Sequence, residues 1–425
     1  MGESRSKRRD RLQSLESALL GGARPEPQGP KASATQRAGV ATSAGDPAVA
    51  AVLEAALRSS GRVERATHGF HTWPAGLNPD AARLLLGLGT GPVLDPFCGG
   101  GTVLVEALLA GRPALGLDVS SVACLVARAR TTLTTEDERT AMRTRARAAA
   151  AAALAIAGPN ATPPPGTQVP SFIQDAYDAH VAAELFAIRN AMGDSALLRA
   201  VFSAILVKVS HRVSDTVHRL EPRPRAPGTT ATLFHAKARE YGRMLQALAE
   251  AVPPGVRAQV HREDARGFRS RGLKVGSGAD TEATRVPFGL VLTSPPYPGV
   301  YDYLPMQALR RWWLDLDDDA ALEDEIGTRR SFRHDRGAAL TRWREDTMRW
   351  TRAAARALGP GGRLVILVGD GDIHGGHVDA WPTTDAAARE AGLTLDARVT
   401  VERWDEGLRV FRPEHAAVWT KAASN

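Results

Sequence analysis

The chain has 425 residues, of which 43% are hydrophobic and 5% aromatic, enough apolar residues for one large domain or two smaller ones. Its formal net charge is +7, and nearly all of the positive charge is Arg because Lys occurs at only six positions. The two cysteines, Cys98 and Cys124, have no CxxC spacing and argue against a disulfide framework or a metal site. With no signal peptide and no apolar stretch of membrane-spanning length, a cytoplasmic protein without membrane contact is expected.

Residues 1–45 are polar, basic and rich in Gly, Pro, Ser and Ala, which predicts a mostly disordered arm. Helices are predicted at 47–60 and 78–88, the second capped by Asn78 with a proline at its first position. The chain then alternates, with strands at 92–94 and 113–117 and helices at 102–110 and 120–131. This alternation predicts an α/β fold with a Rossmann-like, doubly wound and mostly parallel sheet.

The alternation is interrupted by a long, mostly helical stretch. Asp118 and Asp264 end consecutive predicted strands, yet they are 146 positions apart, whereas one helix-and-strand step needs roughly 30 residues. Roughly 110 residues are therefore inserted, either for recognition or as a plain stabilising subdomain. We divide the chain into the arm (1–45), a first part of the α/β domain (46–132), a helical insertion (133–255) and a second part of the α/β domain (256–425).

The second part of the α/β domain contains a tetrapeptide, Ser294-Pro295-Pro296-Tyr297, directly after the buried strand 288–293. The prolines stop the strand and fix the backbone, between a hydroxyl and an aromatic ring. This arrangement suits a planar ring that bears an NH2 group, although a plain strand-end turn is equally compatible. Downstream, the acidic run 315–325 is interpreted as a solvated face rather than a metal site. A helix at 341–358, a strand at 363–368, a helix at 383–391 and strands near 393–402 and 416–420 complete the pattern.

A glycine-rich loop, Asp95-Pro96-Phe97-Cys98-Gly99-Gly100-Gly101-Thr102, follows the first strand and opens a helix. Its glycines let the backbone approach a ligand closely, and the helix N–H groups favour a negative group such as a carboxylate. It is neither the GxGxxG dinucleotide motif nor a P-loop, which requires Gly-Lys-Ser/Thr. Asp118 ends the next strand, in a position suited to ribose hydroxyls, and Asp264 ends the strand after the insertion, where a carboxylate can accept from an adenine amino group.

Together these four features, which end successive strands, resemble the amino-methyltransferases that use S-adenosylmethionine to methylate exocyclic nitrogens of DNA bases. The resemblance covers roughly residues 67–420, because Thr67 to Ala75 is similar to an HGxHxYPA segment of one branch of bacterial DNA methylases. It implies that Asp118 holds the cofactor ribose and Asp264 faces the adenine. It also implies a cofactor loop formed by Asp95, Pro96, Phe97, Gly99, Gly101 and Thr102, and a catalytic base clamp formed by Ser294, Pro295, Pro296 and Tyr297.

The resemblance implies a site-specific DNA methyltransferase, with a cognate restriction nuclease as a partner. Ser294 at the head of the signature favours cytosine N4, whereas the order of the motifs is less usual for that class and keeps adenine N6 open. An RNA enzyme, such as a tRNA guanine-N2 methyltransferase, and a non-catalytic nucleic-acid-binding protein are the alternatives. His68 and His71 are expected to pack or to contact substrate rather than metal. Candidate phosphate contacts in the insertion are Arg212, Arg219, Arg223 and Arg225, although a solvated face is equally compatible.

Overall fold

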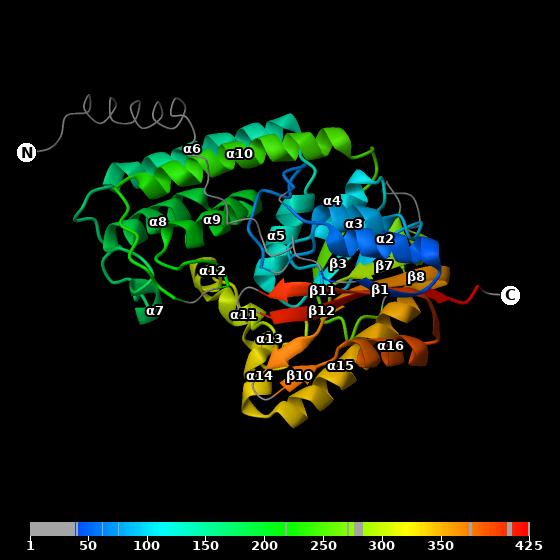
Figure 1. Cartoon of the computed structure of the whole chain (residues 1–425). Coiled ribbons are helices and arrows are strands. Elements are labelled where there is room, and N and C mark those ends of the chain that lie inside the picture. Colours follow the sequence, from blue (N-terminus) through cyan, green and yellow to red (C-terminus); the bar gives the residue numbers. More distant parts are fainter. Residues whose placement is uncertain are drawn as a thin grey trace, which may run out of the picture.

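A computed structural model describes residues 39, 41–61, 63–74, 76–216, 219–269, 272–275, 284–373, 376–405 and 410–423 (Figure 1). At its centre lies an eight-stranded sheet with the order β1-β11-β12-β8-β7-β2-β3-β4. These strands are β1 (Ala41–Gly45), β2 (Val93–Asp95), β3 (Ala114–Asp118), β4 (Ala258–Arg262), β7 (Phe288–Thr293), β8 (Leu358–Gly369), β11 (Leu393–Asp405) and β12 (Val410–Lys421). Two small antiparallel pairs are formed by β5 (Leu273–Val275) with β6 (Thr284–Val286) and by β9 (Gly371–Ile373) with β10 (Gly376–Val378).

The strands from β4 to β8 run parallel, and β12, β11 and β1 follow at the edge of the sheet, each antiparallel to the strand before it. β2 pairs with β3 on one side and with β7 on the other, so the direction of winding reverses between β2 and β7. Ligands of open α/β sheets bind at the carboxyl ends of the strands beside such a reversal. The doubly wound α/β fold predicted from the sequence is therefore confirmed.

Helices cover both faces of the sheet, because successive buried strand residues point to opposite sides. One face packs on α2 (Pro47–Arg58), α3 (Pro79–Leu86), α4 (Thr102–Leu109) and α5 (Ser121–Thr131), and the other on α15 (Arg336–Ala357) and α16 (Trp381–Glu390) (Figure 1). The predicted cap of α3 is present, since Asn78 Oδ1 accepts from the Asp80 N–H at 2.8 Å. Three short helices, α11 (Tyr303–Met306), α13 (Asp319–Asp324) and α14 (Arg329–His334), follow β7 near the strand ends.

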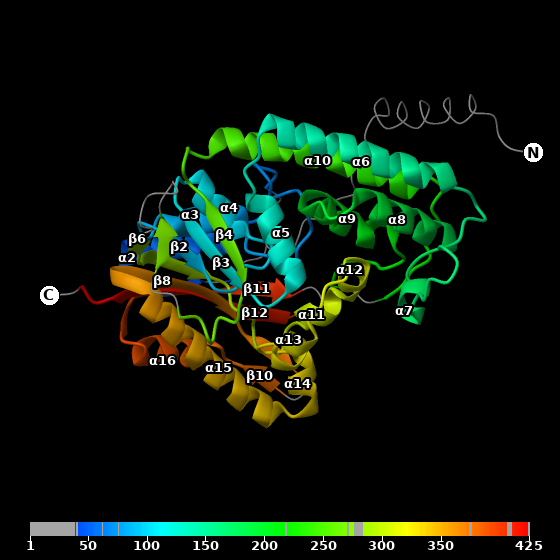
Figure 2. The same cartoon turned by 180° about the vertical axis from the view of Figure 1, so that it is seen from behind.

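A separate helical layer lies beside the sheet (Figure 2) and is formed by α6 (Glu136–Ile156), α7 (Ser171–Gln174), α8 (Ala179–Met192), α9 (Ala196–Val209) and α10 (Thr229–Ala251). The long helices α6 and α10 lie side by side. A capping box starts α6, because Thr135 and Glu138 exchange side-chain and backbone hydrogen bonds. The core of this layer also takes in Phe70 and Trp313, the latter from α12 (Ala308–Trp313), so segments on both sides of the insertion hold it to the α/β domain.

The N-terminal end of the fold differs from the expectation. Residues 1–38, most of the arm predicted to be disordered, lie outside the described residues. The last five residues of that predicted arm instead form β1, with Ala41 opposite Val401 and Gly45 opposite Ala397 of β11. The segment Ala-Thr-Ser-Ala-Gly carries no apolar alternation that would indicate a strand. It forms an edge strand through backbone pairing with β11, which does not depend on side-chain type. Among the described residues, no helix combines the length and apolar character needed to cross a bilayer.

Candidate active site

The carboxyl ends of β2, β3, β4 and β7 converge on one cavity. Seven of the eight residues predicted to bind a cofactor line it, namely Asp95, Pro96, Phe97, Gly99, Thr102, Asp118 and Asp264. The eighth, Gly101, lies behind the loop, where it starts α4 with φ 80° and a Cβ would lie 3.0 Å from Ala127 Cα. Residues that are up to 169 positions apart in the sequence are thus brought together by the parallel strand ends.

The glycine loop is tightly covered by Trp73, from the segment that precedes α3. A Cβ on Gly99 would lie 2.7 Å from Trp73 Nε1, and one on Gly100 would lie 2.9 Å from Trp73 Cβ. Gly99 also has φ 48°, in the left-handed region that side chains disfavour. Gly99 is therefore required both for backbone conformation and for space, whereas Gly100 is required for space alone.

Asp118 connects the end of β3 to the glycine loop. One carboxylate oxygen accepts from the Gly99 N–H at 3.0 Å and the other accepts from the Ser120 N–H at 2.9 Å. Burial raises the pKa of Asp118 to about 6, although these hydrogen bonds favour the ionised form. The remaining lone pairs of the carboxylate face the cavity that Asp118 lines, where they can accept from hydroxyl groups.

Asp95, at the end of β2, is 3% exposed. Its Oδ1 accepts from the Thr293 hydroxyl at 2.7 Å and from the Phe97 N–H at 3.1 Å. Burial raises the pKa of Asp95 to about 7, an effect that the two hydrogen bonds reduce but do not cancel. The side chain therefore braces the turn from β2 into the loop and joins it to β7.

Asp264 is engaged by a neighbour from its own loop. Arg266 donates from Nε to both carboxylate oxygens at 3.0 Å and from Nη2 to Oδ2 at 2.6 Å, and a second ion pair holds Arg266 to Asp346 of α15 at 2.9 Å. Burial alone would raise the pKa of Asp264, but the hydrogen bonds from Arg266 outweigh it and lower the pKa. Asp264 is thus an ionised and oriented carboxylate in the lining of the cavity. Sequence reasoning did not predict its contact with Arg266.

The tetrapeptide after β7 separates this first cavity from a second one. Ser294 lines both cavities, Pro296 lines the first, Tyr297 lines the second, and Pro295 is buried. The first cavity continues to Tyr303, which is shared as well. Three tyrosines line the second cavity, namely Tyr297, Tyr301 and Tyr303. Residues at or next to the last strands complete its lining, among them Leu367, Gly369, Asp370, Arg403, Arg412 and Glu414. Four residues line both cavities and so form the boundary between them, namely Gly76, Leu77, Ser294 and Tyr303.

Tyr297 is held more firmly than a freely stacking ring. Its hydroxyl donates to Glu414 Oε1 at 2.8 Å, and Glu414 pairs in turn with Arg403 at 2.5 Å. A Cβ on Gly369 would lie 2.6 Å from Tyr297 Cε2, so the ring rests directly on the backbone of β8. Burial and the neighbouring Glu414 carboxylate raise the pKa of Tyr297 well above its usual value, which keeps the phenol protonated.

The histidines of the segment before α3 both have protein partners. His68 Nε2 lies 2.6 Å from Glu106 Oε1, and His71 Nε2 lies 2.9 Å from Ser203 Oγ of α9. Burial lowers the pKa of His71 well below its usual value, so the ring is neutral and Nε2 accepts from the Ser203 hydroxyl. The backbone carbonyls of His68 and His71 accept from the buried Arg130, which also donates to the Gly100 carbonyl at 2.9 Å. This arginine joins the covering segment to the glycine loop, and no sequence signal pointed to it.

Most carboxylates of the acidic run are exposed, as predicted, but two of them are buried next to the site. Asp318 is fully buried and accepts from both the N–H and the hydroxyl of Ser121, at 3.0 and 2.9 Å, at the start of α5. Glu325 lines the first cavity and accepts from the Tyr303 N–H at 2.6 Å. Burial raises the pKa of Glu325 to about 7. These carboxylates satisfy backbone N–H groups next to the site, which a charge count cannot reveal.

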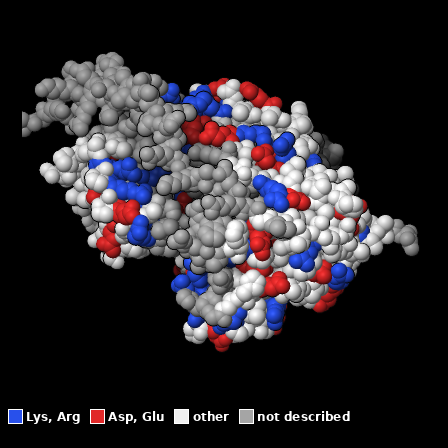
Figure 3. Space-filling view, viewed as in Figure 1, with Lys and Arg blue, Asp and Glu red and all other residues white. Residues whose placement is uncertain are grey.

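Of the four arginines considered as phosphate contacts, Arg212 requires correction because it is buried. Arg212 is 4% exposed and donates to the Met306 carbonyl at 2.9 Å, so it holds the segment between β7 and α12 instead of facing solvent. Arg219 is exposed and pairs with Glu221, and Arg225 donates to the Lys208 carbonyl at 2.6 Å. Among the described residues on the face seen in Figure 3, groups of Lys and Arg side chains lie beside groups of Asp and Glu.

Comparison with known proteins yields a family match over part of the chain. Residues 70–162 match the family model described as "RMKL-like, methyltransferase domain", and no curated protein matches the chain. The matched range includes Trp73, the glycine loop and Asp118. The match marks a methyltransferase domain, and S-adenosylmethionine is its cofactor.

Similar solved structures are more distant. TrmN from Thermus thermophilus has 14% identity and a TM-score of 0.30, with 82% of this chain and 50% of TrmN covered, so this chain spans half the length of that protein. A SAM-dependent methyltransferase from Methanosarcina mazei has 10% identity and a TM-score of 0.29, with 78% and 93% covered. The rRNA methyltransferase aviRa from Streptomyces viridochromogenes has 13% identity and a TM-score of 0.30, with 82% and 88% covered. These TM-scores are too low to add to the fold described above.

Proposed function

We propose that this methyltransferase transfers the methyl group of S-adenosylmethionine to an exocyclic amino group of a nucleic-acid base. The observation that supports this proposal most directly is the position of Ser294, whose side chain borders both the first and the second cavity. A cofactor in the first cavity and a base in the second would meet at this residue. The lining of the second cavity by three tyrosines favours a flat aromatic substrate.

The residues of the first cavity fit the chemical parts of the cofactor. The glycine loop and the first turn of α4 offer N–H groups and close backbone approach, which suit the methionine carboxylate. Asp118, with its free lone pairs, suits the ribose hydroxyls. Asp264, oriented by Arg266, suits the adenine amino group. We assign the cofactor to Asp95, Pro96, Phe97, Gly99, Gly101, Thr102, Asp118 and Asp264 on this basis.

The tetrapeptide supplies the groups that act on the acceptor nitrogen. The lone pair of an exocyclic amine is delocalised into its ring, so the amine is a weak nucleophile. Hydrogen bonds from its N–H groups to the Ser294 hydroxyl and the Pro295 carbonyl would localise that lone pair on nitrogen. Tyr297, fixed by Glu414 and Gly369, would hold the ring in register. When bound, S-adenosylmethionine would supply a methyl group from its positively charged sulfur and leave as S-adenosylhomocysteine, and the methylated amine would release its extra proton to water.

For the substrate we propose RNA first and DNA second. The motifs resemble DNA amino-methyltransferases, but the matched family model is the RMKL-like methyltransferase domain and not that DNA family. A base in either polymer must be unstacked to reach a cavity behind Ser294. DNA as the substrate, cytosine N4 or adenine N6 as the acceptor and a cognate restriction nuclease as a partner form the second candidate, which the form of the Ser294–Tyr297 signature favours.

The test is methyl transfer from radiolabelled S-adenosylmethionine to total RNA and, separately, to genomic DNA, followed by mass spectrometry of the digested nucleosides. An N-methylated base in RNA is the expected product. Radiolabel found in DNA alone would show that DNA and not RNA is the substrate, whereas the proposed methyl transfer to an exocyclic amino group would stand. The matched variant Tyr297→Ala should lose about 100-fold in turnover yet keep cofactor affinity. Cofactor binding by the wild-type chain without transfer to either polymer would contradict the proposed reaction and support a non-catalytic nucleic-acid-binding protein.

A further inference from the structure

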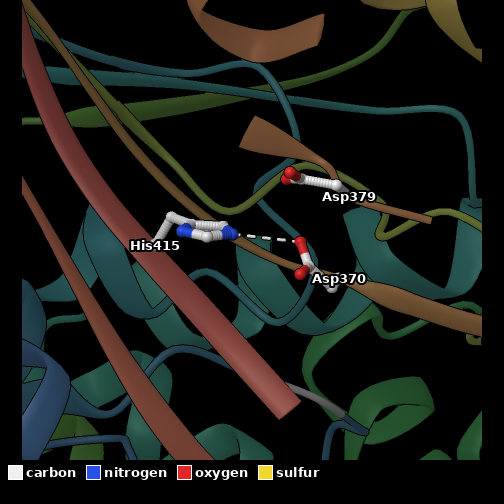
Figure 4. A group of neighbouring side chains, drawn as sticks. All are labelled: Asp370, Asp379 and His415. Atoms are coloured by element: carbon white, nitrogen blue, oxygen red, sulfur yellow. Dashed lines mark hydrogen bonds and ion pairs between the residues drawn. The ribbon is translucent and has the colours of Figure 1, made fainter. Parts of the chain in front are cut away.

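A second polar cluster lies at the carboxyl end of β8, beside the second cavity. Asp370 directly follows β8 and lines that cavity, and His415 projects from the neighbouring strand β12. His377 lies in β10, and Asp379 follows its last residue. Figure 4 shows Asp370, Asp379 and His415 pointing toward one another from these separate segments. None of the four residues has a role in the methyl transfer described above.

The potential ligand atoms of this cluster are close together. One carboxylate oxygen of Asp370, one of Asp379 and one ring nitrogen of His415 all lie within 4.8 Å of one another. His415 Nε2 lies 3.0 Å from Asp370 Oδ1, and His377 Nε2 lies 3.0 Å from Asp370 Oδ2. His377 and Asp379 are two residues apart along an extended segment, so both side chains project from one side while the buried Val378 faces the core.

The two buried members of the cluster are already oriented by the protein. Asp370 is 2% exposed and accepts from the Ala380 N–H at 2.9 Å, and His415 is 4% exposed with Nδ1 2.9 Å from Thr400 Oγ1. Such outer hydrogen bonds fix the ring and carboxylate orientation of metal ligands. The Nε2 atom of His415 is left facing Asp370, and a metal ion would replace the hydrogen shared between them.

We propose that Asp370, His377, Asp379 and His415 bind a divalent transition-metal ion, with Zn²⁺ as the best match. Two carboxylates balance the charge of one divalent cation, and two imidazole ligands favour Zn²⁺ over Mg²⁺ or Ca²⁺, which prefer oxygen ligands alone. Entry is open from solvent, because the His377 side chain is 54% exposed and Asp379 is exposed, whereas the other two ligands form the buried floor.

The ion would fasten the β9–β10 hairpin to the main sheet next to the second cavity. His377 and Asp379 belong to the hairpin side, whereas His415 belongs to β12. Asp370 directly follows Gly369, on which the Tyr297 ring rests, and His415 directly follows Glu414, which accepts from the Tyr297 hydroxyl. Metal binding would therefore rigidify the same wall that positions Tyr297, without any contact between the ion and the reacting groups.

Titration calorimetry of the tag-free, chelator-treated full chain with ZnCl2 tests the site, together with thermal unfolding with and without Zn²⁺. One equivalent of Zn²⁺ should bind per chain and raise the melting temperature, while MgCl2 should give no comparable binding. His377→Ala and Asp379→Asn should each weaken Zn²⁺ binding by about tenfold or more. The zinc-free melting temperature of each variant is its own baseline, from which Zn²⁺ should give a smaller rise than in the wild type.

His261→Ala provides the matched control, since His261 is an exposed histidine on β4 at the opposite end of the sheet order. Its Zn²⁺ affinity should equal that of the wild type. Absence of saturable Zn²⁺ binding, or equal affinity in the wild type, His377→Ala and Asp379→Asn, would overturn the proposed site. The readouts are binding and unfolding, so the result is independent of whether RNA, DNA or neither is methylated.

Discussion

The Thr293 hydroxyl donates a 2.7 Å hydrogen bond to Asp95 Oδ1 and so joins the carboxyl ends of β7 and β2, which are 198 residues apart in the chain. These two strands flank the point at which the sheet reverses its winding. Asp95 starts the glycine loop and Thr293 immediately precedes the tetrapeptide, so one buried hydrogen bond fixes the separation of the two proposed binding elements.

Replacing Thr293 with Val should destabilise the protein by about 1–3 kcal/mol, because it removes the donor from a buried carboxylate without changing side-chain volume. Urea unfolding measures this change. Thr351→Val is the matched control, because Thr351 is also fully buried but its hydroxyl has no hydrogen-bond partner among the described residues. Equal destabilisation of the two variants would show that the contact between Thr293 and Asp95 contributes nothing specific.

The raised pKa of Asp95 predicts a pH dependence of stability. Its pKa is about 7 in the folded chain and near the ordinary value of 3.8 when unfolded, so between these values the folded state binds more protons. The contribution of Asp95 to stability is therefore fully present below about pH 4 and falls as pH rises to about 7. The difference in unfolding free energy between the wild type and Asp95→Asn should follow this fall across pH 4–7, and a difference that is constant with pH would contradict it.

Asp118→Ala should weaken S-adenosylmethionine binding by about tenfold or more, because hydrogen bonds to an ionised carboxylate contribute about 1.5–3 kcal/mol. Titration calorimetry gives the affinity directly. Asp175→Ala removes an exposed carboxylate outside the cavity and should leave the affinity unchanged. Wild-type affinity in Asp118→Ala would remove this residue from the proposed cofactor site.

Gly369→Ala should lower methyl transfer by about 100-fold while leaving cofactor affinity intact, because its Cβ would come within 2.6 Å of the Tyr297 ring and displace it. Single-turnover transfer and calorimetry separate the two effects. In the control Gly158→Ala, the added Cβ would meet no atom within 4 Å, and activity should be retained. A fully active Gly369→Ala variant would show that the position of Tyr297 does not control the reaction.

Local sequence patterns were sufficient to predict which residues of the candidate site lie at strand ends. Asp95, Asp118 and Asp264 were each expected at the end of a strand, and the parallel arrangement brings all three to one cavity. This succeeds because apolar strand runs and glycine turns are read from neighbouring residues, and parallel strands place their carboxyl ends at the same edge. The two-cavity arrangement around Ser294 could not be predicted in this way, since the second cavity is built largely from the last strands.

The sequence by itself determined the doubly wound sheet and the residues at its carboxyl edge, because both depend on periodicity and spacing over a few residues. Only the tertiary structure decided which partners those residues have. Tyr297 and Glu414 are 117 positions apart, and His71 and Ser203 are 132 apart. Such pairs form when non-neighbouring strands and helices pack, and the same packing buries Asp318 and Glu325, which a charge pattern places in solvent. Burial then changes what each side chain does, from a solvated charge to a fixed acceptor beside the site.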